Sequence, residues 1–272
     1  MSRIMNQAAV TMNQIQNKLD IIGNNISNNG TTGYKSRQVE FSSLLNQQIN
    51  NLNALENAEG RLTPDGIRVG SGAGLGAIHL NQQQGSLVET NRVLDAALTG
   101  ENTFFQVNRI ENGQEEMVYT RDGSFYLSPA EGDTLALTTS DGHPIIGQEG
   151  PIEIQDGFDS IEFNDRGQLI VTRGDNQAAE AELAIVEAVR PSALEAEGDN
   201  FFSVSAEADA DEIIQAYAGE GVVIQPQSLE QSNVDLSRAM TDMIAAQRLY
   251  QFNSRSITMG DQMSGLVNTI RS

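Results

Sequence analysis

The chain has 272 residues, a formal net charge of −21 and no cysteine. This length suits one large domain or two ordinary ones, and it is enough to bury a hydrophobic core. No run of about 18 apolar residues occurs, so we expect no membrane insertion. The N-terminus lacks the basic and apolar regions of a cleavable signal peptide. Without cysteine there are no disulfides and no thiolate metal sites, which leaves the compartment open.

The negative charge is concentrated in the middle of the chain. Residues 1–50 carry a net charge of +2 and residues 234–272 a net charge of +1, so residues 51–233 carry −24. Nucleic-acid binding needs clustered Lys and Arg, so this distribution excludes nucleic acid from the expected partners. A solvated acidic surface is the simplest interpretation.

The first predicted element is a helix with a strict seven-residue repeat. Apolar residues occupy two positions of this repeat, three residues apart, as in the seam of a coiled coil. The alternative is a single amphipathic helix packed on its own domain. The residues predicted to form the seam are Met5, Ala8, Met12, Ile15, Leu19, Ile22 and Ile26.

The last predicted element is a helix with two apolar stripes. The first contains Leu236, Met243, Tyr250 and Ile257, with Ala239 and Ala246 between them. The second contains Phe252, Met259, Met263, Leu266 and Ile270. The second begins two residues after a member of the first, which is about 200° of helical rotation, so the stripes lie on nearly opposite sides. A helix that is apolar on two sides needs two neighbours. We expect the N-terminal helix to cover the first stripe and a second copy of the protein to cover the other.

The sequence Ser232-Asn-Val-Asp235 has the form of a capping box, which predicts the start of this C-terminal helix.

Between the two helices, the sequence is typical of strands and turns. VYTRDGSFYLS (118–128) alternates apolar and polar residues around Asp122-Gly123, which predicts a two-residue hairpin. Further turns are expected at Asn112-Gly113, Asp141-Gly142, Asp156-Gly157 and Arg166-Gly167. Strands are expected at Phe104–Arg109, Ile152–Gln155, Ser160–Phe163, Gln168–Thr172 and Leu183–Val189.

We therefore predict an α+β fold. The N- and C-terminal helices pair as a coiled coil, and a mostly antiparallel β domain is inserted between them. The predicted domains are a terminal helical domain (1–30 and 230–272), a connector (31–70) and a central β domain (71–229).

The sequence contains no convincing catalytic or ligand-binding motif. His79 and His143 have no partners at metal-ligand spacing. Gly72-x-Gly74-x-x-Ala77 matches a loose dinucleotide fingerprint but no βαβ unit surrounds it, so these glycines are better explained by bent strands. Asp209-x-Asp211 lacks the glycine and the final glutamate of a calcium loop. We expect no catalytic, cofactor-binding or metal-binding residues, no cofactor and no enzyme activity.

Five stretches of the sequence resemble the flagellar axial protein family, whose members build the rod and hook. They are NNISNNGTTGYKSRQVEF (24–41), QGSLVETNRVLDAAL (84–98), YTRDGSFYL (119–127), PSALEAEGDNFF (191–202) and EQSNVDLSRAMTDMIAAQRLYQFNSRSI (230–257). They cover nearly the whole chain in the family's order. The family-motif residues at the end of the first helix are Asn24, Asn25, Thr31, Thr32, Gly33, Tyr34 and Lys35.

The chain departs from the family's pattern at two points. Gly100-Glu-Asn-Thr-Phe104-Phe105 lacks the second glycine of the usual Gly-x-Gly-Phe-Phe, and Ile26-Ser27-Asn28 replaces the usual small residue after Asn-Asn. The length is similar to that of a rod protein and not of the longer hook protein. A distal-rod type and a Gram-positive rod paralogue both stay open.

The resemblance implies a structural subunit of the flagellar basal-body rod that polymerises helically and transmits torque to the hook. Its expected partners are copies of itself, other rod and hook proteins, and the flagellar type III export apparatus. Its expected location is the basal body outside the cytoplasmic membrane, in the cell wall or periplasm, reached without a cleaved signal. Asn and Gly after the first helix allow the chain to turn outward, and Lys35 and Arg37 are expected to meet acidic neighbours. Two alternatives are an extracellular coiled-coil stalk or adhesin subunit and an unrecognised hydrolase on the β domain.

Overall fold

The computed structural model divides the chain into two compact units. We call the first, Met1–Ile26, Arg37–His79 and Leu236–Ser272, the helical unit, and the second, Ser27–Ser36 and Leu80–Asp235, the β unit. The structure describes residues 2–43, 46–49, 67–70, 73–111, 114–130, 132–198, 200–204, 210–217 and 224–271.

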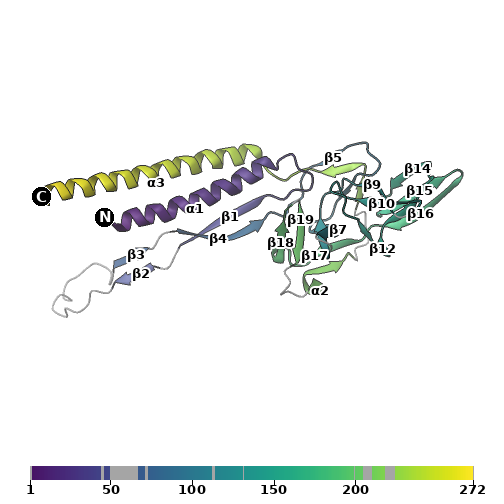
Figure 1. Ribbon diagram of the computed structural model, residues 1–272, viewed down its shortest axis with the longest axis horizontal. Coiled ribbons are helices and arrows are strands. Elements are labelled where there is room, and N and C mark those ends of the chain that lie inside the picture. The colour runs from purple at the N-terminus through teal and green to yellow at the C-terminus, as the bar shows by residue number, and fades with distance from the viewer. Residues whose placement is uncertain are drawn as a thin grey trace. The chain divides into compact units, whose positions relative to one another are not determined.

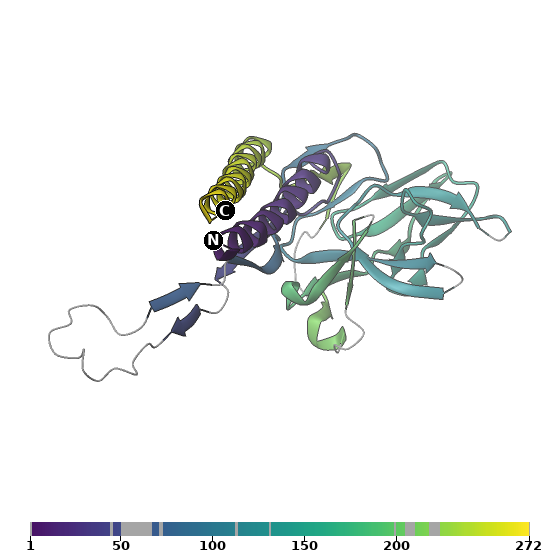
Figure 2. The same ribbon diagram turned by 60° about the vertical axis from the view of Figure 1, so that its left-hand side comes forward.

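The helical unit contains two long helices, α1 (Ser2–Ser27) and α3 (Leu236–Arg271). They run side by side in both views, and the N-terminal end of α1 lies beside the C-terminal end of α3 (Figures 1 and 2). The pair is therefore antiparallel. Among the described residues, no helix is both long and apolar enough to cross a membrane.

The helical unit also contains short strands from the segment predicted as a connector and from the residues that follow it. Strand β1 (Arg37–Ser43) pairs with β4 (Ala73–Leu80), and β2 (Asn46–Ile49) pairs with β3 (Ile67–Gly70). Gly74 of the loose dinucleotide fingerprint lies in β4, which is a strand and not the start of a helix, and Gly72 lies outside the described residues. Asp209 of the weak calcium-loop pattern lies outside the described residues.

A turn of Asn, Thr and Gly ends α1. The backbone N–H of Thr31 donates to the carbonyl of Asn28 at 3.1 Å, and Gly33 has a φ of 67°. A positive φ is favourable for glycine and strained for most other residues. The sequence therefore ends the helix and redirects the chain, as predicted from the Asn- and Gly-rich segment.

The largest sheet of the β unit has six antiparallel strands in the order β18-β19-β8-β7-β17-β20. Their bounds are β18 Leu194–Glu197, β19 Phe201–Val204, β8 Gln114–Thr120, β7 Thr103–Glu111, β17 Ile185–Ala188 and β20 Ile214–Ala216. Strands β7 and β8 form a hairpin whose register runs from Phe105 opposite Thr120 to Glu111 opposite Gln114. The predicted turn at Asn112-Gly113 lies outside the described residues.

Smaller antiparallel sheets complete the β unit. Two have three strands: β13 (Glu153–Gln155), β10 (Thr134–Thr138) and β9 (Tyr126–Pro129), and β14 (Ser160–Phe163), β15 (Gln168–Arg173) and β16 (Asn176–Glu182). Three are pairs: β11 (Ile146–Gly147) with β12 (Gly150–Pro151), β21 (Ile224–Pro226) with β6 (Ala96–Leu98), and β22 (Ser228–Glu230) with β5 (Leu87–Glu89). A short helix α2 (Ala210–Ile213) and a 3-10 turn η2 (Pro191–Ala193) connect strands. The mostly antiparallel β domain and its five predicted strands are confirmed.

Two hydrophobic cores lie on opposite faces of β7. Phe105 belongs to the larger core and packs edge-on against Phe125, with ring centroids 5.1 Å apart. Phe104 belongs to the smaller core and packs edge-on against Phe202 at 5.3 Å. Adjacent strand residues point to opposite faces, so two consecutive phenylalanines serve both cores.

The hairpin predicted around Asp122-Gly123 is wrong. Strand β8 pairs with β7 and β19, and β9 pairs with β10. Gly123 instead approaches another part of the backbone, and its carbonyl accepts from the N–H of Ala96 at 3.0 Å. A Cβ on Gly123 would lie 1.7 Å from the carbonyl oxygen of Ala96. The glycine permits this close approach and not a hairpin turn.

The capping box at the start of α3 is also wrong in detail. The helix begins at Leu236, directly after Asp235, so Asp235 precedes the helix instead of occupying its third position. The Ser232 hydroxyl accepts from the N–H of Val234 at 3.4 Å, within the turn before the helix.

Candidate self-assembly site

Helix α1 buries one side, and that side is the predicted seam. Ala8, Ile15 and Ile22 are 5–7% exposed. The other seam residues, Met5, Met12, Leu19 and Ile26, are half-buried. The neighbouring positions are mostly polar and exposed, so the seven-residue repeat does correspond to one side of the helix.

Helix α3 has a narrow stripe of buried and half-buried residues. Ala246 is 3% exposed, and Met243, Tyr250 and Ile257 are half-buried. At Gly260 an added Cβ would lie 3.1 Å from Cγ of Met5, so the Met5 side chain packs directly on the backbone of Gly260. Leu236, predicted for the same seam, is 41% exposed because it is the first residue of α3.

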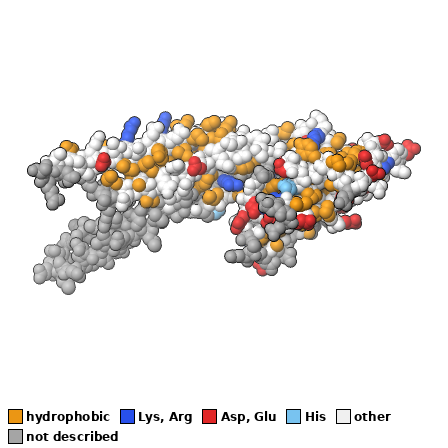
Figure 3. Space-filling model, in the orientation of Figure 1, with side chains coloured by type: hydrophobic (Ala, Val, Ile, Leu, Met, Phe, Trp, Pro, Cys, Tyr) orange, Lys and Arg blue, Asp and Glu red, His pale blue; other side chains and the backbone are white. Residues whose placement is uncertain are grey.

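The opposite side of α3 carries large apolar side chains in solvent. Phe252 is 67% exposed, Leu266 59%, Met259 56% and Met263 54%. Ile270 belongs to α3, but its side chain lies outside the described residues. In the orientation of Figure 3, hydrophobic side chains gather over α3, whereas Asp and Glu gather over the β unit.

Sequence reasoning missed three further exposed apolar residues of α3. They are Met240, Ile244 and Leu249, with exposed fractions of 44–56%. Met240 and Ile244 do not share a heptad position with the predicted stripe, so only their apolar character marked them. Leu249 lies two heptads before Met263, and that spacing could have identified it. Isolated exposed apolar residues are common in proteins, but a continuous series on one helix marks an interaction surface.

The family-motif residues bring together the two places where the chain enters and leaves the β unit. The Asn25 carboxamide donates to the carbonyl of Arg37 at 2.8 Å and accepts from its N–H at 2.9 Å, all within the helical unit. Thr32 donates its hydroxyl to the carboxylate of Asp122 at 2.8 Å. Burial raises the pKa of Asp122, and hydrogen bonds from Thr32 and Ser124 oppose that shift. The turn after α1 is therefore fastened to the segment that follows β8.

Lys35 does meet an acidic neighbour, as expected, but deep inside the β unit. Its Nζ lies 2.7 Å from Oε1 of Glu230, and both side chains are at most 1% exposed. Arg121 reaches the other oxygen of Glu230, with Nε 2.8 Å from Oε2. Burial, followed by the charge of Arg121, lowers the pKa of Lys35 to about 8, and Glu230 opposes this shift. Of the other motif residues, Asn24 is exposed and Tyr34 is buried.

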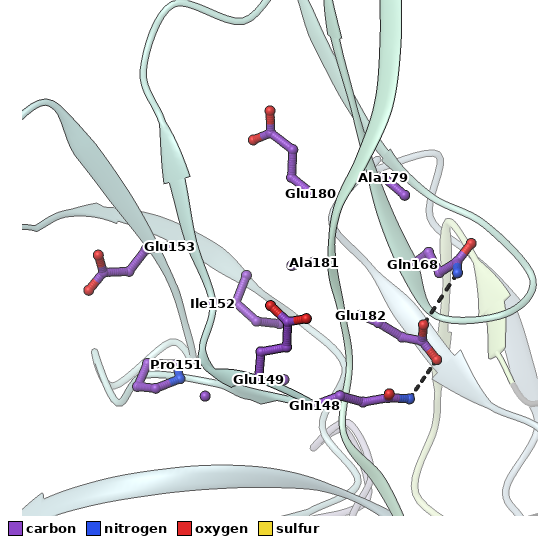
Figure 4. Close-up of a pocket in the computed structure, with 12 residues that line it drawn as sticks. Gln148, Glu149, Pro151, Ile152, Glu153, Gln168, Ala179, Glu180, Ala181 and Glu182 are labelled. Atoms are coloured by element: carbon purple, nitrogen blue, oxygen red, sulfur yellow. Dashed lines mark hydrogen bonds between the residues drawn. The ribbon is translucent and has the colours of Figure 1, made fainter.

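A polar cavity of about 450 Å³ opens elsewhere in the β unit, between residues 147–153 and the end of β16. Glu182 accepts from Gln148 at 2.6 Å and from Gln168 at 3.3 Å, so its carboxylate is already paired (Figure 4). Glu149, Glu153 and Glu180 stand apart in the same view. Within the described part of the chain no cluster of three acidic or histidine side chains could hold a metal ion. His143 lies in a turn with its ring edge-on to Phe201, at a centroid distance of 5.7 Å.

Family profiles match both ends and part of the middle of the chain. Residues 5–35 match the flagella basal body rod protein profile, and residues 225–270 match the C-terminal profile of flagellar basal body rod FlgEFG proteins. Residues 97–171 match the D1 domain of the flagellar hook proteins FlgE/F/G.

Curated relatives match over the full length. The chain is 41% identical over 276 aligned residues to the flagellar hook-basal body complex protein FlhP of Bacillus subtilis, with 100% of both chains covered. It is 32% identical to the flagellar basal-body rod protein FlgG of Agrobacterium fabrum, with 96% of each chain covered. It is also 32% identical to FlgG of Borreliella burgdorferi, over 100% of this chain and 99% of the relative.

The chain belongs to the flagellar rod and hook protein family.

Within this family, the profile matches coincide with the candidate site. The match over 5–35 contains α1 and the motif through Lys35, and the match over 225–270 contains Glu230 and α3. Bacillus subtilis has both an FlhP, at 41% identity, and an FlgG, at 32% identity over 96% of each chain. This agrees with the two types left open by the sequence, a distal-rod protein and a Gram-positive paralogue. The membership also agrees with the expectation of a structural protein and not an enzyme.

Proposed function

We propose that this chain is a structural subunit of the flagellar basal-body rod. Subunits polymerise helically through their terminal helices and form a drive shaft that transmits torque to the hook. The observation that carries the proposal is that the family profiles match the two ends of the chain, where α1 and α3 supply an antiparallel helix pair with an uncovered apolar side. Other rod and hook proteins and further copies of this chain are its assembly partners.

The two helices pair as an antiparallel coiled coil in one register. The contact between Met5 and Gly260 sets the register. In an antiparallel pair, a residue a given number of positions after Met5 lies opposite the residue the same number of positions before Gly260. Extended by whole heptads, the register places Met12 opposite Asn253, Leu19 opposite Ala246 and Ile26 opposite Ala239. The same register places Ile15 opposite Tyr250 and Ile22 opposite Met243, so large and small residues of α3 alternate along the seam.

The same register explains why Leu236 is exposed. Its opposite position would be residue 29, which lies beyond the end of α1 at Ser27. Leu236 therefore stands on the seam side of α3 without a partner in α1, and a neighbouring subunit is the expected cover.

The uncovered side of α3 binds a neighbouring subunit at a different surface. Phe252, Met259 and Leu266 recur every seven residues, so they form one column along the helix. A contact between two different surfaces does not close on itself and produces a helical polymer. In water each exposed side chain of this size gains about 1.5–3 kcal/mol from full burial.

Subunits reach the rod unfolded, through the flagellar type III export apparatus. The assembled rod lies outside the cytoplasmic membrane, in the cell wall or periplasm.

An extracellular coiled-coil stalk or adhesin is the second candidate, favoured only by the helical ends. Light scattering of the purified chain at increasing concentration separates the two. A rod subunit forms open polymers that lengthen with concentration, whereas a stalk stops at a closed trimer.

The decisive experiment is complementation of a deletion strain of the source bacterium. The variant Leu19→Asp with Met243→Asp introduces carboxylates on both sides of the seam, and each buried charge is strongly unfavourable. We expect loss of motility and no complete rod in electron micrographs of isolated basal bodies. The matched control, Asn17→Asp with Gln247→Asp, places the same charges on exposed positions and should restore swimming. Normal swimming of the seam variant would reject the proposal.

A further inference from the structure

Three charged side chains are fully buried where the two ends of the chain enter and leave the β unit. Lys35 and Arg121 have exposed side-chain fractions of 0%, and Glu230 of 1%. Charged residues are seldom buried to this extent unless paired and hydrogen-bonded. None of the three takes part in the helix packing described above.

Hydrogen bonds satisfy each member of this group. Lys35 donates from Nζ to Oε1 of Glu230 at 2.7 Å, to the carbonyl of Gln83 at 2.8 Å and to the carbonyl of Gln82 at 3.5 Å. The Glu230 carboxylate also accepts from the backbone N–H of Gly85 at 2.8 Å. The ammonium therefore has three acceptors, and the carboxylate has three donors from three parts of the chain.

Arg121 is held as firmly. Its Nε donates to Glu230 at 2.8 Å, and its Nη1 donates to the carbonyls of Thr103 at 2.9 Å and Gly100 at 3.1 Å. The guanidinium lies 5.9 Å from the ring centroid of Phe104, at the edge of the smaller core. Arg121 thus anchors the group to the six-stranded sheet.

The group joins two segments that are 195 residues apart in sequence. Lys35 belongs to the segment that follows α1, and Glu230 to strand β22 before α3. Backbone bonds run parallel to the ion pair: the N–H of Gly33 donates to the carbonyl of Glu230 at 2.8 Å, and the N–H of Ser36 to the side chain of Asn233 at 2.8 Å. We call residues 31–36 the first crossing and residues 228–235 the second crossing.

The charges in the group are unequal, since two cations share one carboxylate. Glu230 is therefore the member whose loss matters most, because it would leave two like charges buried side by side. When Glu230 is neutral, Lys35 destabilises the group by repulsion with Arg121. Removal of Lys35 should then stabilise the group.

We propose that Lys35, Arg121 and Glu230 form a buried charge clamp that holds the two crossings together on the β unit, with Glu230 as its central anion. The clamp sets the two neighbouring points from which the chain ends leave this unit. The inference rests on contacts within the β unit and holds whether or not the chain builds a rod.

The test measures the distance between the crossings in the purified full-length chain. The protein has no cysteine, so Gly30→Cys and Gln231→Cys create the only two labelling sites. Both positions are exposed, and an added Cβ at Gly30 meets nothing within 4 Å. Spin labels at these sites report the distance distribution by double electron–electron resonance, and amide exchange at Gly33 and Gly85 reports the local bonds.

The variants are expected to change the distance distribution and the amide exchange rates in different directions. Glu230→Gln should broaden the distance distribution and accelerate exchange at Gly33 and Gly85 by about tenfold or more, as expected for loss of charged hydrogen bonds. Lys35→Met alone should accelerate exchange at Gly33 a few-fold. In the Glu230→Gln background, Lys35→Met should instead slow exchange and narrow the distribution again.

The control is Glu197→Gln, which removes a carboxylate from a surface pair with Arg109 in the same unit. It should leave the distribution and both amides unchanged. If Glu230→Gln fails to fold, restoration of folding by Lys35→Met supports the clamp, and failure to restore it overturns the clamp. An unchanged distribution in folded Glu230→Gln, or the same direction of change from Lys35→Met in both backgrounds, also overturns it.

Discussion

The two units of this molecule use their apolar residues in opposite ways. In the β unit, Phe104, Phe105 and Phe125 have no exposed surface at all. In the helical unit, Phe252 of α3 has two thirds of its surface in solvent. One unit therefore has a closed core, and the other leaves large apolar side chains uncovered. Burial of apolar surface is the main source of stability, so under the proposed function the helices gain stability from neighbours and the β unit does not need them.

The largest effect should separate the units directly. Phe105→Ala leaves a cavity in the larger core and should lower the free energy of unfolding of the β unit by about 3–5 kcal/mol. Phe252→Ala should change the stability of the dilute monomer by no more than about 0.5 kcal/mol, yet slow polymerisation. Urea unfolding and light scattering measure the two quantities. Equal effects of both variants on monomer stability would contradict the difference in burial between the two units.

The next effect concerns the close backbone approach inside the β unit. Gly123→Ala places a Cβ against the carbonyl of Ala96 and should cost about 2 kcal/mol or more, because backbone on both sides must shift. Gly198→Ala meets nothing within 4 Å and is the matched control, with a change near zero. Thermal unfolding followed by circular dichroism compares them. A tolerated Gly123→Ala would contradict the close approach.

A smaller effect is expected on the seam of the helical unit. Ala246→Leu adds volume where α3 is 3% exposed and should weaken the helix pair by about 1–3 kcal/mol. Gln247→Leu is the control, at an exposed position of the same helix that shares no heptad position with Phe252, Met259 and Leu266. Helical circular dichroism at polymerising concentration should fall for the first variant only. If both variants polymerise alike, the proposed register is wrong.

The smallest effect is the pH dependence from Lys35. Its pKa is about 8 in the folded chain and 10.5 in a model compound, so between these values the unfolded chain binds more protons than the folded one. The free energy of unfolding therefore rises with pH across this window, by at most about 1.4 kcal/mol per pH unit. This gain in the free energy of unfolding is lost again as pH falls toward 8. Arg121, Glu230 and Glu101 are the charged groups that act on Lys35.

Urea unfolding at pH 7, 8, 9 and 10 measures this slope, and Lys35→Met is the reference that lacks the group. We expect the slope of the wild type to exceed that of Lys35→Met between pH 8 and 10. Identical slopes would show that Lys35 is not held in the charged, desolvated state described here.

The helices and the strands could be predicted from sequence because their signals are local. The seven-residue repeat of α1 identified Ala8, Ile15 and Ile22 as one side of a helix, and the structure buries that side. Alternating apolar residues likewise located β14 and β15. Local patterns fail where a residue serves a distant contact. Asp122-Gly123 has the composition of a hairpin turn. Gly123 instead lies against the backbone of Ala96, whose N–H donates to the carbonyl of Gly123.

The charge clamp could not be predicted for the same reason. Lys35, Arg121 and Glu230 each look like solvated surface charges in an acidic chain, and nothing in their spacing relates them. The resemblance to the rod and hook family pointed to Lys35 and to the segment around Arg121, but not to their common partner. Only the fold, which pairs β22 with β5, brings Glu230 between them.

The segment Leu80–Asp235 is an exchangeable part of the β unit, because Asn233 near its end donates to the carbonyl of Asn81 near its start at 2.7 Å. A segment whose entry and exit lie side by side can be lengthened, exchanged or deleted while the flanking chain keeps its path. Loops on the far side from Gly33 and Glu230 are therefore the places where a fluorescent protein or an affinity tag can be inserted.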